Sequence, residues 1–346
     1  MRKSIKRVLY APNIHQGGGK VLLTPLLEIL GNDPYCLLVL DERIGWAGAA
    51  DAAATVRMVK PTLTARLWNE VALCKWVGRD TMILCMGNLP PLLAPSGRKT
   101  VFLQNWYLAS RAQLSGFPPL TTLRIVIERL WLRFRLKRRD RIVVQTQTMK
   151  KHVEANLGRP AEVVPFCDRE GIVKTRASLA SREKVYDFLY VASGEPHKNH
   201  RVLVQAWRLL AARGVFPRLC LTLGMQRNTE LTQWIKAQIE EAGLNIELVG
   251  DELDHRQVLE LYGQARAFIY PSLFESFGLP LIEAAEFGMP IVASDRAYVA
   301  EVVASFSSFD PQSALSVANA VEQVDFSRAS EPRGIATPEG FLEAVF

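Results

Sequence analysis

The sequence predicts an α/β protein made of two doubly wound domains. Short apolar runs rich in β-branched residues alternate with stretches whose apolar residues recur at helical spacing. Because the apolar runs are nearly continuous, we expect parallel sheets that helices cover on both faces. This alternation of apolar runs and helical stretches is interrupted by a polar stretch, residues 167–184, and then resumes. We predict that the polar stretch is the linker between two domains. This predicts one domain at 1–167 and a second at 168–346.

The expected elements follow from the same alternation. In the first half we expect strands at 6–12, 35–41, 81–87, 100–105, 141–146 and 161–166, and helices at 18–31, 65–78, 121–138 and 147–157. In the second half we expect strands at 186–193, 218–224, 246–250, 267–272 and 290–295, and helices at 199–214, 229–242, 254–264, 278–288 and 313–324. Residues 326–346 are polar and weakly patterned, and their end is expected to pack back on the first domain. Ligands in such folds lie beyond the carboxyl ends of the strands, so the cleft between the two facing domains is the expected active site.

Composition narrows the class of protein. Hydrophobic residues make up 49% of the chain and charged residues 22%, as in ordinary globular proteins. The five cysteines are scattered and lack C-x-x-C spacing, which argues against a disulfide framework or a zinc site and favours a reducing cytoplasm. The basic N-terminus has no long apolar core after it, so we expect no signal peptide. No apolar run approaches the roughly 18 residues that a membrane-spanning helix needs.

Two carboxylates frame the start of an expected helix. Glu275 and Glu283 lie eight positions apart in "ESFGLPLIE". Glu275 falls in the loop after a strand, and Pro280 suits the first position of the helix that carries Glu283. A helix N-terminus offers unpaired N–H groups and a positive dipole end, whereas carboxylates accept hydrogen bonds from hydroxyls. A ligand with both phosphates and sugars fits this arrangement. The alternative is that the two acids only stabilise the helix dipole.

The surrounding residues carry a family resemblance. "YPSLFESFGLPLIEAAEFGMPIVASD" closely resembles the nucleotide-sugar-binding region of retaining glycosyltransferases of family 4, the group 1 glycosyl transferases. The similarity extends over about 186–325 and is weaker before residue 140. It implies the GT-B fold, in which two Rossmann-like domains face a central cleft, with an N-terminal acceptor-binding domain and a C-terminal domain for the nucleotide-sugar donor. It also implies transfer of a sugar to a hydroxyl with retained configuration and without a metal.

The resemblance assigns roles to individual residues of the second domain. Glu283 is expected to bind the ribose hydroxyls, Glu275 to lie at the donor sugar, and Lys198 to neutralise the leaving diphosphate; a solvated lysine at a helix start is the alternative for Lys198. The remaining donor-binding residues are expected to be Ser276, Phe277, Gly278, Leu279, Val249 and Gly250. The family's arginine a few residues before this lysine is replaced here by "SGEP" at 193–196. Arg227 is a candidate substitute, or else an arginine of a surface loop.

The first domain offers a glycine segment and a polar strand end. Gly17, Gly18 and Gly19 follow the first strand and allow close backbone approach to a phosphate or sugar at a helix N-terminus. They match neither the G-x-x-x-x-G-K-[ST] nor the G-x-G-x-x-G pattern. They resemble the family's glycine loop over the donor phosphates, and the alternative is a plain flexible loop. The acceptor candidates are His15, Gln104 and Asn105. Where many relatives have a histidine, Gln104 and Asn105 stand beside two aromatic residues; a capping turn is the alternative for this segment.

A basic segment accounts for much of the net charge of +7. In residues 121–141 one helical face carries Leu123, Ile127, Leu130, Trp131 and Phe134, and arginines dominate the remainder. Such a helix can lie on an anionic membrane, which suits a lipid-linked acceptor. The alternative is the solvated face of a buried helix. No nucleic-acid-binding motif accompanies the charge, so we expect no nucleic-acid partner.

These observations predict a cytoplasmic hexosyl- or deoxyhexosyltransferase, peripheral on the inner face of the membrane, that builds a bacterial surface polysaccharide (O-antigen, lipopolysaccharide or capsule). No set of residues has metal-ligand spacing, so no metal cofactor is expected. Glu286, one helical turn after Glu283, is expected to face water. Three alternatives stay open: a non-catalytic sugar-nucleotide-binding protein, a nucleic-acid-binding protein, and another enzyme of the same fold such as a phosphorylase or an epimerase.

Overall fold

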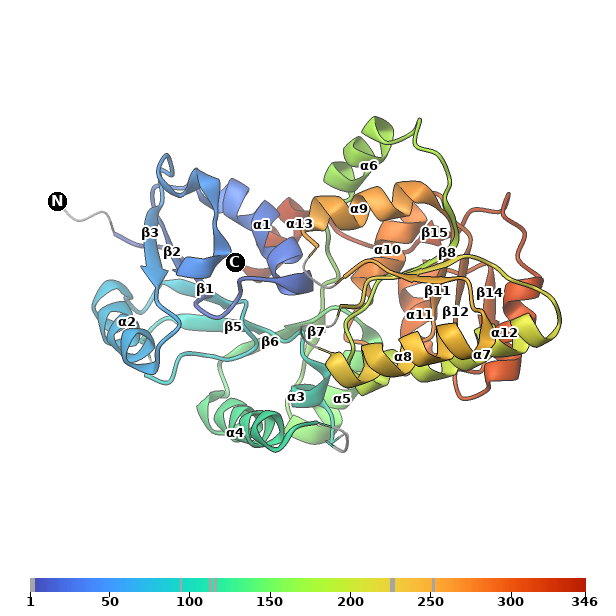
Figure 1. Ribbon diagram of the computed structural model, residues 1–346. Helices are drawn as coiled ribbons and strands as arrows, with labels where there is room; N and C mark the ends of the chain where they lie inside the picture. Colours follow the sequence, from blue (N-terminus) through green and yellow to red (C-terminus); the bar gives the residue numbers. More distant parts are fainter. Residues whose placement is uncertain (1–3, 94, 112–113, 115–116, 225–227, 251–252) are drawn as a thin grey trace. The chain divides into compact units, whose positions relative to one another are not determined.

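The computed structural model describes residues 4–93, 95–111, 114, 117–224, 228–250 and 253–346 (Figure 1). The chain divides into two compact units. Unit 1 is Met1–Asp168 together with Ile335–Phe346, and unit 2 is Arg169–Gly334. The end of the chain therefore belongs to unit 1. Among the described residues, none of the helices has both the length and the apolar composition to cross a membrane.

Unit 1 contains a seven-stranded sheet in the order β3-β2-β1-β4-β5-β6-β7. All of its strand pairs are parallel. The strands are β1 (Arg7–Ala11), β2 (Cys36–Asp41), β3 (Thr55–Val59), β4 (Met82–Cys85), β5 (Arg98–Phe102), β6 (Arg141–Val144) and β7 (Glu162–Val163). The central strands are almost wholly buried, which is why their sequences read as continuous apolar runs. Edge strand β3 was not predicted, because "TVRMV" is mostly half-exposed and mixes polar with apolar residues.

Helices cover both faces of this sheet. Figure 1 shows α1 and α13 on one face and α2, α4 and α5 on the other. The helices are α1 (Gly17–Leu30), α2 (Leu63–Trp76), α3 (Trp106–Ala109), α4 (Pro119–Arg135), α5 (Gln147–Leu157) and α13 (Pro338–Val345), with short 3-10 turns at Glu42–Ile44 and Ala47–Ala49. The weakly patterned end of the chain thus holds a helix. Its Phe341 is fully buried and stacks on Phe166 with ring centroids 3.9 Å apart.

Unit 2 contains a six-stranded parallel sheet in the order β10-β9-β8-β11-β12-β14. Its strands are β8 (Tyr186–Tyr190), β9 (Leu219–Leu221), β10 (Ile246–Leu248), β11 (Ala265–Tyr270), β12 (Ile291–Ser294) and β14 (Ser307–Phe309); β13 (Val303–Ala304) and β15 (Glu331–Pro332) form a separate antiparallel pair. Its helices are α6 (Arg169–Ser178), the 3-10 helix η3 (Pro196–Lys198), α7 (His200–Ala212), α8 (Thr229–Ala242), α9 (His255–Gln264), α10 (Leu279–Glu286), α11 (Ala297–Val302) and α12 (Ala314–Glu322). The prediction of two doubly wound α/β units is confirmed.

Helix α6 changes two predictions in unit 2. The boundary between the units, after Asp168, lies in the polar stretch 167–184 that was predicted as a linker, but most of this stretch is helix α6 and the turn after it. Arg169 of this helix pairs with the carboxylate of Glu286, and Arg176 donates a hydrogen bond to the Glu286 carbonyl oxygen at 2.8 Å. Glu286 is therefore buried rather than facing water. The polar residues of α6 are packing contacts, which its sequence alone does not reveal.

Candidate functional site

The two glutamates of the motif lie at the carboxyl end of β11. The strand ends at Tyr270, a loop follows, and α10 begins at Leu279. Gly278 caps the helix with φ at +90°, a conformation in the left-handed region that favours glycine, and Pro280 occupies the first turn. Glu275 in the loop and Glu283 on the helix are both buried, as the strand–loop–helix interpretation requires.

Glu275 forms an ion pair with Lys198. The Lys198 Nζ donates to the Glu275 Oε1 at 2.7 Å, and the side chains are 15% and 11% exposed. The pair is thus largely desolvated but still reaches the surface, where a ligand can contact it. Burial by itself raises the pKa of Glu275, but the Lys198 charge and hydrogen bond outweigh burial and hold that pKa below its usual value. Glu275 is therefore an anion at neutral pH, suited to stabilise positive charge rather than to donate a proton.

The backbone around Lys198 is held at several points. The Tyr190 hydroxyl donates to the Lys198 carbonyl oxygen at 2.7 Å. Asn199 adopts a left-handed conformation with φ at +62°, and its Nδ2 donates to the carbonyl oxygens of Pro271 at 3.1 Å and Pro311 at 2.7 Å. One amide thus joins the loop that carries the lysine to the loop that carries Glu275. The cation and the carboxylate are held in place before any ligand arrives.

The residues beside Lys198 in the sequence contribute little further positive charge to the site. Burial lowers the pKa of His197 to about 4, so its ring is neutral at pH 7 while it stacks on Phe274. In the stretch 193–196, where the family has an arginine, the Ser193 hydroxyl hydrogen-bonds to the Glu195 carboxylate. Arg227, the candidate substitute, lies outside the described residues.

Glu283 is held by two side chains that the sequence analysis missed. His255 Nε2 lies 2.7 Å from its Oε1, and the Tyr262 hydroxyl donates to its Oε2 at 3.0 Å. Each carboxylate oxygen retains a second lone pair, so the group can still accept from a ligand hydroxyl. The missed signal was helical spacing: His255 and Tyr262 are seven residues apart in α9 and therefore lie on one face.

The remaining predicted donor residues lie at the carboxyl ends of unit 2 strands. Phe277 and Leu279 are buried, so their side chains belong to the packing of unit 2. Val249 and Gly250 follow β10; the Val249 N–H donates to the Leu221 carbonyl oxygen at 3.1 Å, and Gly250 has φ at +96°. Ser276 is half-buried in the loop between the two glutamates. The structure thus places these residues and Lys198 along one edge of the sheet.

In unit 1 the glycine segment forms the start of α1. Gly17, with φ at +62°, and Gly18 are exposed, and a Cβ atom built on either meets no atom within 4 Å. Gly19 is closer to its surroundings, because its Cβ would lie 3.8 Å from Gln104 Oε1. The Gln104 Nε2 is buried and has no hydrogen-bond partner in the described part of the chain. The fold therefore brings Gly19 and Gln104 together at the carboxyl ends of β1 and β5, with the half-buried His15 in the turn before the glycines.

Asn105 has a structural role in the turn that follows β5. Its Oδ1 accepts from the Tyr107 N–H at 2.9 Å and so caps α3. Asn88, left-handed with φ at +69°, accepts from the backbone N–H groups of Gln104 at 2.6 Å and Asn105 at 2.9 Å. The capping turn named as an alternative is therefore present, and the contact of Asn105 with an acceptor stays a prediction.

Helix α4 presents an apolar stripe to solvent. The exposed side chains of this stripe are Leu120, Leu123, Ile127, Leu130 and Phe134, with Phe134 76% exposed. Trp131, which was predicted on the same face, is instead half-buried and donates from Nε1 to the Pro90 carbonyl oxygen at 2.9 Å. The opposite face of α4 buries Ile125 and Leu132 against the unit 1 core. The stripe is thus additional to the face that packs on the protein.

No group of three histidine, cysteine, aspartate or glutamate side chains with the geometry of a metal site occurs among the described residues.

Comparison with known proteins identifies relatives of the segment that contains Lys198, Glu275 and Glu283. Residues 172–326 match the family described as Glycosyl transferases group 1. The O-antigen chain mannosyltransferase B of Escherichia coli is 36% identical over 118 residues, which are 33% of this chain and 30% of that protein. The O-antigen chain mannosyltransferase RfbU of Salmonella typhimurium is 22% identical over 209 residues, 60% of this chain and 57% of that protein. The aligned segments thus span less than two thirds of these relatives.

Solved structures extend the likeness to both units. Anabaena Alr3699/HepE in complex with UDP and glucose aligns with a TM-score of 0.65 at 15% identity, over 92% of this chain and 89% of that one. Sucrose-phosphate synthase of Thermosynechococcus elongatus aligns with a TM-score of 0.67 at 16% identity, over the same shares. At such identities the likeness concerns the fold, which is GT-B. Residues 172–326 are therefore similar to the glycosyl transferases group 1 family, and the chain as a whole has the GT-B fold.

Proposed function

We propose that this protein is a retaining glycosyltransferase that moves a hexose, with mannose the favoured candidate, from a nucleoside-diphosphate sugar to a hydroxyl of a saccharide or lipid-linked saccharide. The observation that carries the proposal is the buried Glu275–Lys198 ion pair beside the N-terminus of α10. The group 1 domain supports the reaction class, and the mannosyltransferase names of the relatives support the sugar.

The chemistry follows from the charges at this site. The barrier to glycosyl transfer is the departure of a diphosphate from a sugar that becomes oxocarbenium-like. In the proposal, Lys198 and the N–H groups at the start of α10 meet the negative charge on the diphosphate, while the ionised Glu275 faces the positive charge on the sugar. These groups are fixed in advance, which is the arrangement that makes electrostatic stabilisation effective. The proposal includes no metal ion, because the protein itself supplies the compensating charge.

Other residues bind the rest of the donor and the acceptor. Glu283 would accept hydrogen bonds from the ribose hydroxyls while His255 and Tyr262 hold its orientation. The backbone at Val249 and Gly250 would line the base. The Gly17–Gly19 segment would approach the diphosphate. The Gln104 Nε2, which has no hydrogen-bond partner in the described part of the chain, would donate to a sugar hydroxyl.

The setting we propose is assembly of a bacterial surface polysaccharide on the cytoplasmic side of the membrane. The two O-antigen relatives support this setting. The exposed apolar stripe of α4, flanked by the arginines of 124–139, supports peripheral contact with an anionic bilayer. A lipid-linked acceptor would be presented at that surface.

The test is a panel of GDP-, UDP-, ADP- and dTDP-sugars that includes GDP-mannose. We expect one donor to raise the melting temperature and to release its nucleoside diphosphate when a lipid-linked saccharide acceptor is supplied. The anomeric configuration of the product, read by NMR, tests retention. Tight nucleotide binding without release in the presence of any acceptor would instead identify a non-catalytic sugar-nucleotide-binding protein.

A further inference from the structure

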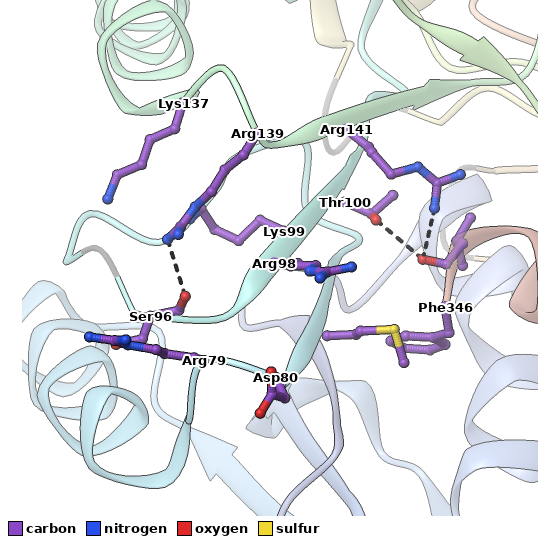
Figure 2. Close-up of a pocket in the computed structure, with 12 residues that line it drawn as sticks. Arg79, Asp80, Ser96, Arg98, Lys99, Thr100, Lys137, Arg139, Arg141 and Phe346 are labelled. Atoms are coloured by element: carbon purple, nitrogen blue, oxygen red, sulfur yellow. Dashed lines mark hydrogen bonds between the residues drawn. The ribbon is translucent and has the colours of Figure 1, made fainter.

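Unit 1 contains a basic pocket at the edge of its sheet opposite to the predicted acceptor residues. The pocket has a volume of about 800 Å³ and lies where β4, β5 and β6 begin (Figure 2). Gln104 and the glycine segment lie where strands of the same sheet end. A five-residue strand such as β5 spans roughly 16 Å, so the pocket is too far from these residues to share their ligand contacts.

The charge of the pocket is unbalanced. Of the six basic residues that line it, Lys99 and Arg141 are paired with acids outside the lining. The other four, Arg79, Arg98, Lys137 and Arg139, have no acidic partner within 4.0 Å among the described residues. Asp80 is an exposed acid in the lining. Four cations around one hollow repel each other unless an anion lies between them. The pocket is therefore suited to an anionic ligand, and arginine forks match the geometry of phosphate oxygens.

The cations of one wall are held in position. Asp140 and Lys99 are both buried, and the Lys99 Nζ lies 3.3 Å from the Asp140 Oδ1. The Asp140 Oδ2 accepts a hydrogen bond from the Lys137 backbone N–H at 2.8 Å. Arg159 donates to the carbonyl oxygens of Lys137 at 2.5 Å and Asp140 at 3.2 Å. Arg139 donates to the Ser96 carbonyl oxygen at 3.1 Å, as Figure 2 shows. These hydrogen bonds fix the backbone of the loop and the guanidinium of Arg139, and they leave the Lys137 ammonium available.

The same loop continues directly from α4. Phe134, the last residue of the exposed apolar stripe, is three residues before Lys137. One continuous segment therefore carries apolar side chains that face water and then cations that face a pocket. An anionic bilayer offers the matching pair of surfaces, acyl chains at the interface and phosphate groups above them.

We propose that this pocket binds the phosphate headgroup of an anionic membrane lipid, while the α4 stripe lies in the interface. The pocket then fixes the orientation of unit 1 on the membrane, with the carboxyl edge of its sheet left free for substrates. The proposal builds on the membrane contact put forward above and is independent of whether the protein transfers mannose.

The experiment measures binding of the full chain to vesicles of phosphatidylcholine, with and without phosphatidylglycerol. The pocket variant is Arg79→Ser/Arg98→Ser/Arg139→Ser. The control variant, Lys60→Ser/Arg111→Ser/Lys151→Ser, removes the same charge from exposed positions of unit 1 outside the pocket. Since each basic residue near an anionic surface contributes about fivefold, we expect the pocket variant to bind the anionic vesicles roughly a hundredfold more weakly. Equal losses in both variants would mean that net charge, rather than the pocket, drives binding, and would overturn the proposal.

A second arm separates a lipid headgroup from free phosphate. The stripe variant Ile127→Ser/Phe134→Ser should lose vesicle binding but keep thermal stabilisation by glycerol phosphate, whereas the pocket variant should lose both. If the pocket variant loses stabilisation by inorganic phosphate but binds anionic vesicles normally, the pocket is a site for free phosphate and the lipid assignment is wrong. Nucleoside diphosphate release with a water-soluble acceptor should be unchanged in the pocket variant. Absence of transfer in the unmodified protein would defeat the proposed function and leave the vesicle result intact.

Discussion

The carboxyl edges of the two sheets are built in opposite ways. In unit 2 the polar groups are buried and already paired: Lys198 with Glu275, and Glu283 with His255 and Tyr262. In unit 1 the corresponding edge has exposed glycines and one amide donor without a partner in the described chain. Fixed charges suit a charged ligand group, such as the diphosphate of the proposed donor. The exposed glycines of unit 1 instead leave the backbone open to close approach by a ligand.

This difference predicts how sensitive each unit is to amino-acid substitution. A buried ion pair is costly to break, because removal of one partner leaves a buried charge without compensation. A substitution in the exposed glycine segment leaves no buried charge unpaired, so its effect on activity should be smaller. Substitutions in unit 2 should therefore have the larger effects, and the following predictions test this order.

The largest effect is expected for Lys198→Met. It removes the cation that we propose to lie beside the diphosphate and leaves Glu275 buried and unpaired, so we expect turnover to fall by about 10²–10³-fold. The pKa of Glu275 should rise once Lys198 is gone, and the acid limb of the pH–rate profile should then move to higher pH. Lys174→Met, on the exposed face of α6, is the matched control and should have normal turnover. Unchanged turnover in Lys198→Met would remove this pair from the catalytic site.

The next effect concerns two buried glutamates of the same helix. Glu283→Ala should raise the KM for the donor by about 10–100-fold, because hydrogen bonds to a charged group are lost. Glu286→Ala breaks the pair with the half-exposed Arg169 and should cost about 1 kcal/mol of stability without changing that KM. Donor titrations and urea unfolding of both variants give the comparison. Equal KM values would show that burial on α10, rather than position at the ligand, determines the effect.

An intermediate effect is expected from His200, which is buried with neither ring nitrogen hydrogen-bonded within the described chain. Burial lowers its pKa to about 3, whereas an unfolded histidine titrates near about 6.5. Between these values the unfolded chain binds the extra proton. The stability from His200 is therefore complete above about pH 6.5 and falls as the pH drops towards 3.

The substitution His200→Leu should flatten this dependence while leaving stability at pH 7 nearly unchanged, because the polar atoms it removes have no partners there. Urea unfolding at pH 7 and pH 5 measures the change. A variant as acid-sensitive as the parent would place the responsible group elsewhere.

The smallest effects on activity are expected in the glycine segment of unit 1. Gly17→Ala forces alanine into a left-handed conformation and should cost about 1–2 kcal/mol of stability. Gly18→Ala carries no such strain and should stabilise α1 by about 0.5–1 kcal/mol. If the backbone here contacts the diphosphate, Gly18→Ala should nevertheless raise the donor KM a few-fold. A stabilised variant with an unchanged KM would show that this edge of unit 1 does not contact the donor.

The sequence predicted most of what depends on local pattern. The buried strands and the amphipathic helices of both units emerged from hydrophobic periodicity, and the "ESFGLPLIE" segment located Glu275 and Glu283 on a loop and a helix. The contacts that were not predicted are long-range: His255 and Tyr262, which contact Glu283, are 28 and 21 residues from it in the sequence. Helix α6 escaped because its arginines pair with α10, a contact that no local pattern encodes.

The return of the chain to unit 1 has a consequence for biosynthesis. Unit 2 is one uninterrupted segment, whereas unit 1 needs the stacking of Phe341 on Phe166 from residues on either side of unit 2. Although the strands of unit 1 leave the ribosome first, unit 2 is the first unit for which every residue has been made. While unit 2 is translated, nascent unit 1 therefore lacks α13, and the surface of Phe166 that Phe341 later covers is exposed. Chaperones that bind exposed apolar surface should recognise unit 1 during that interval.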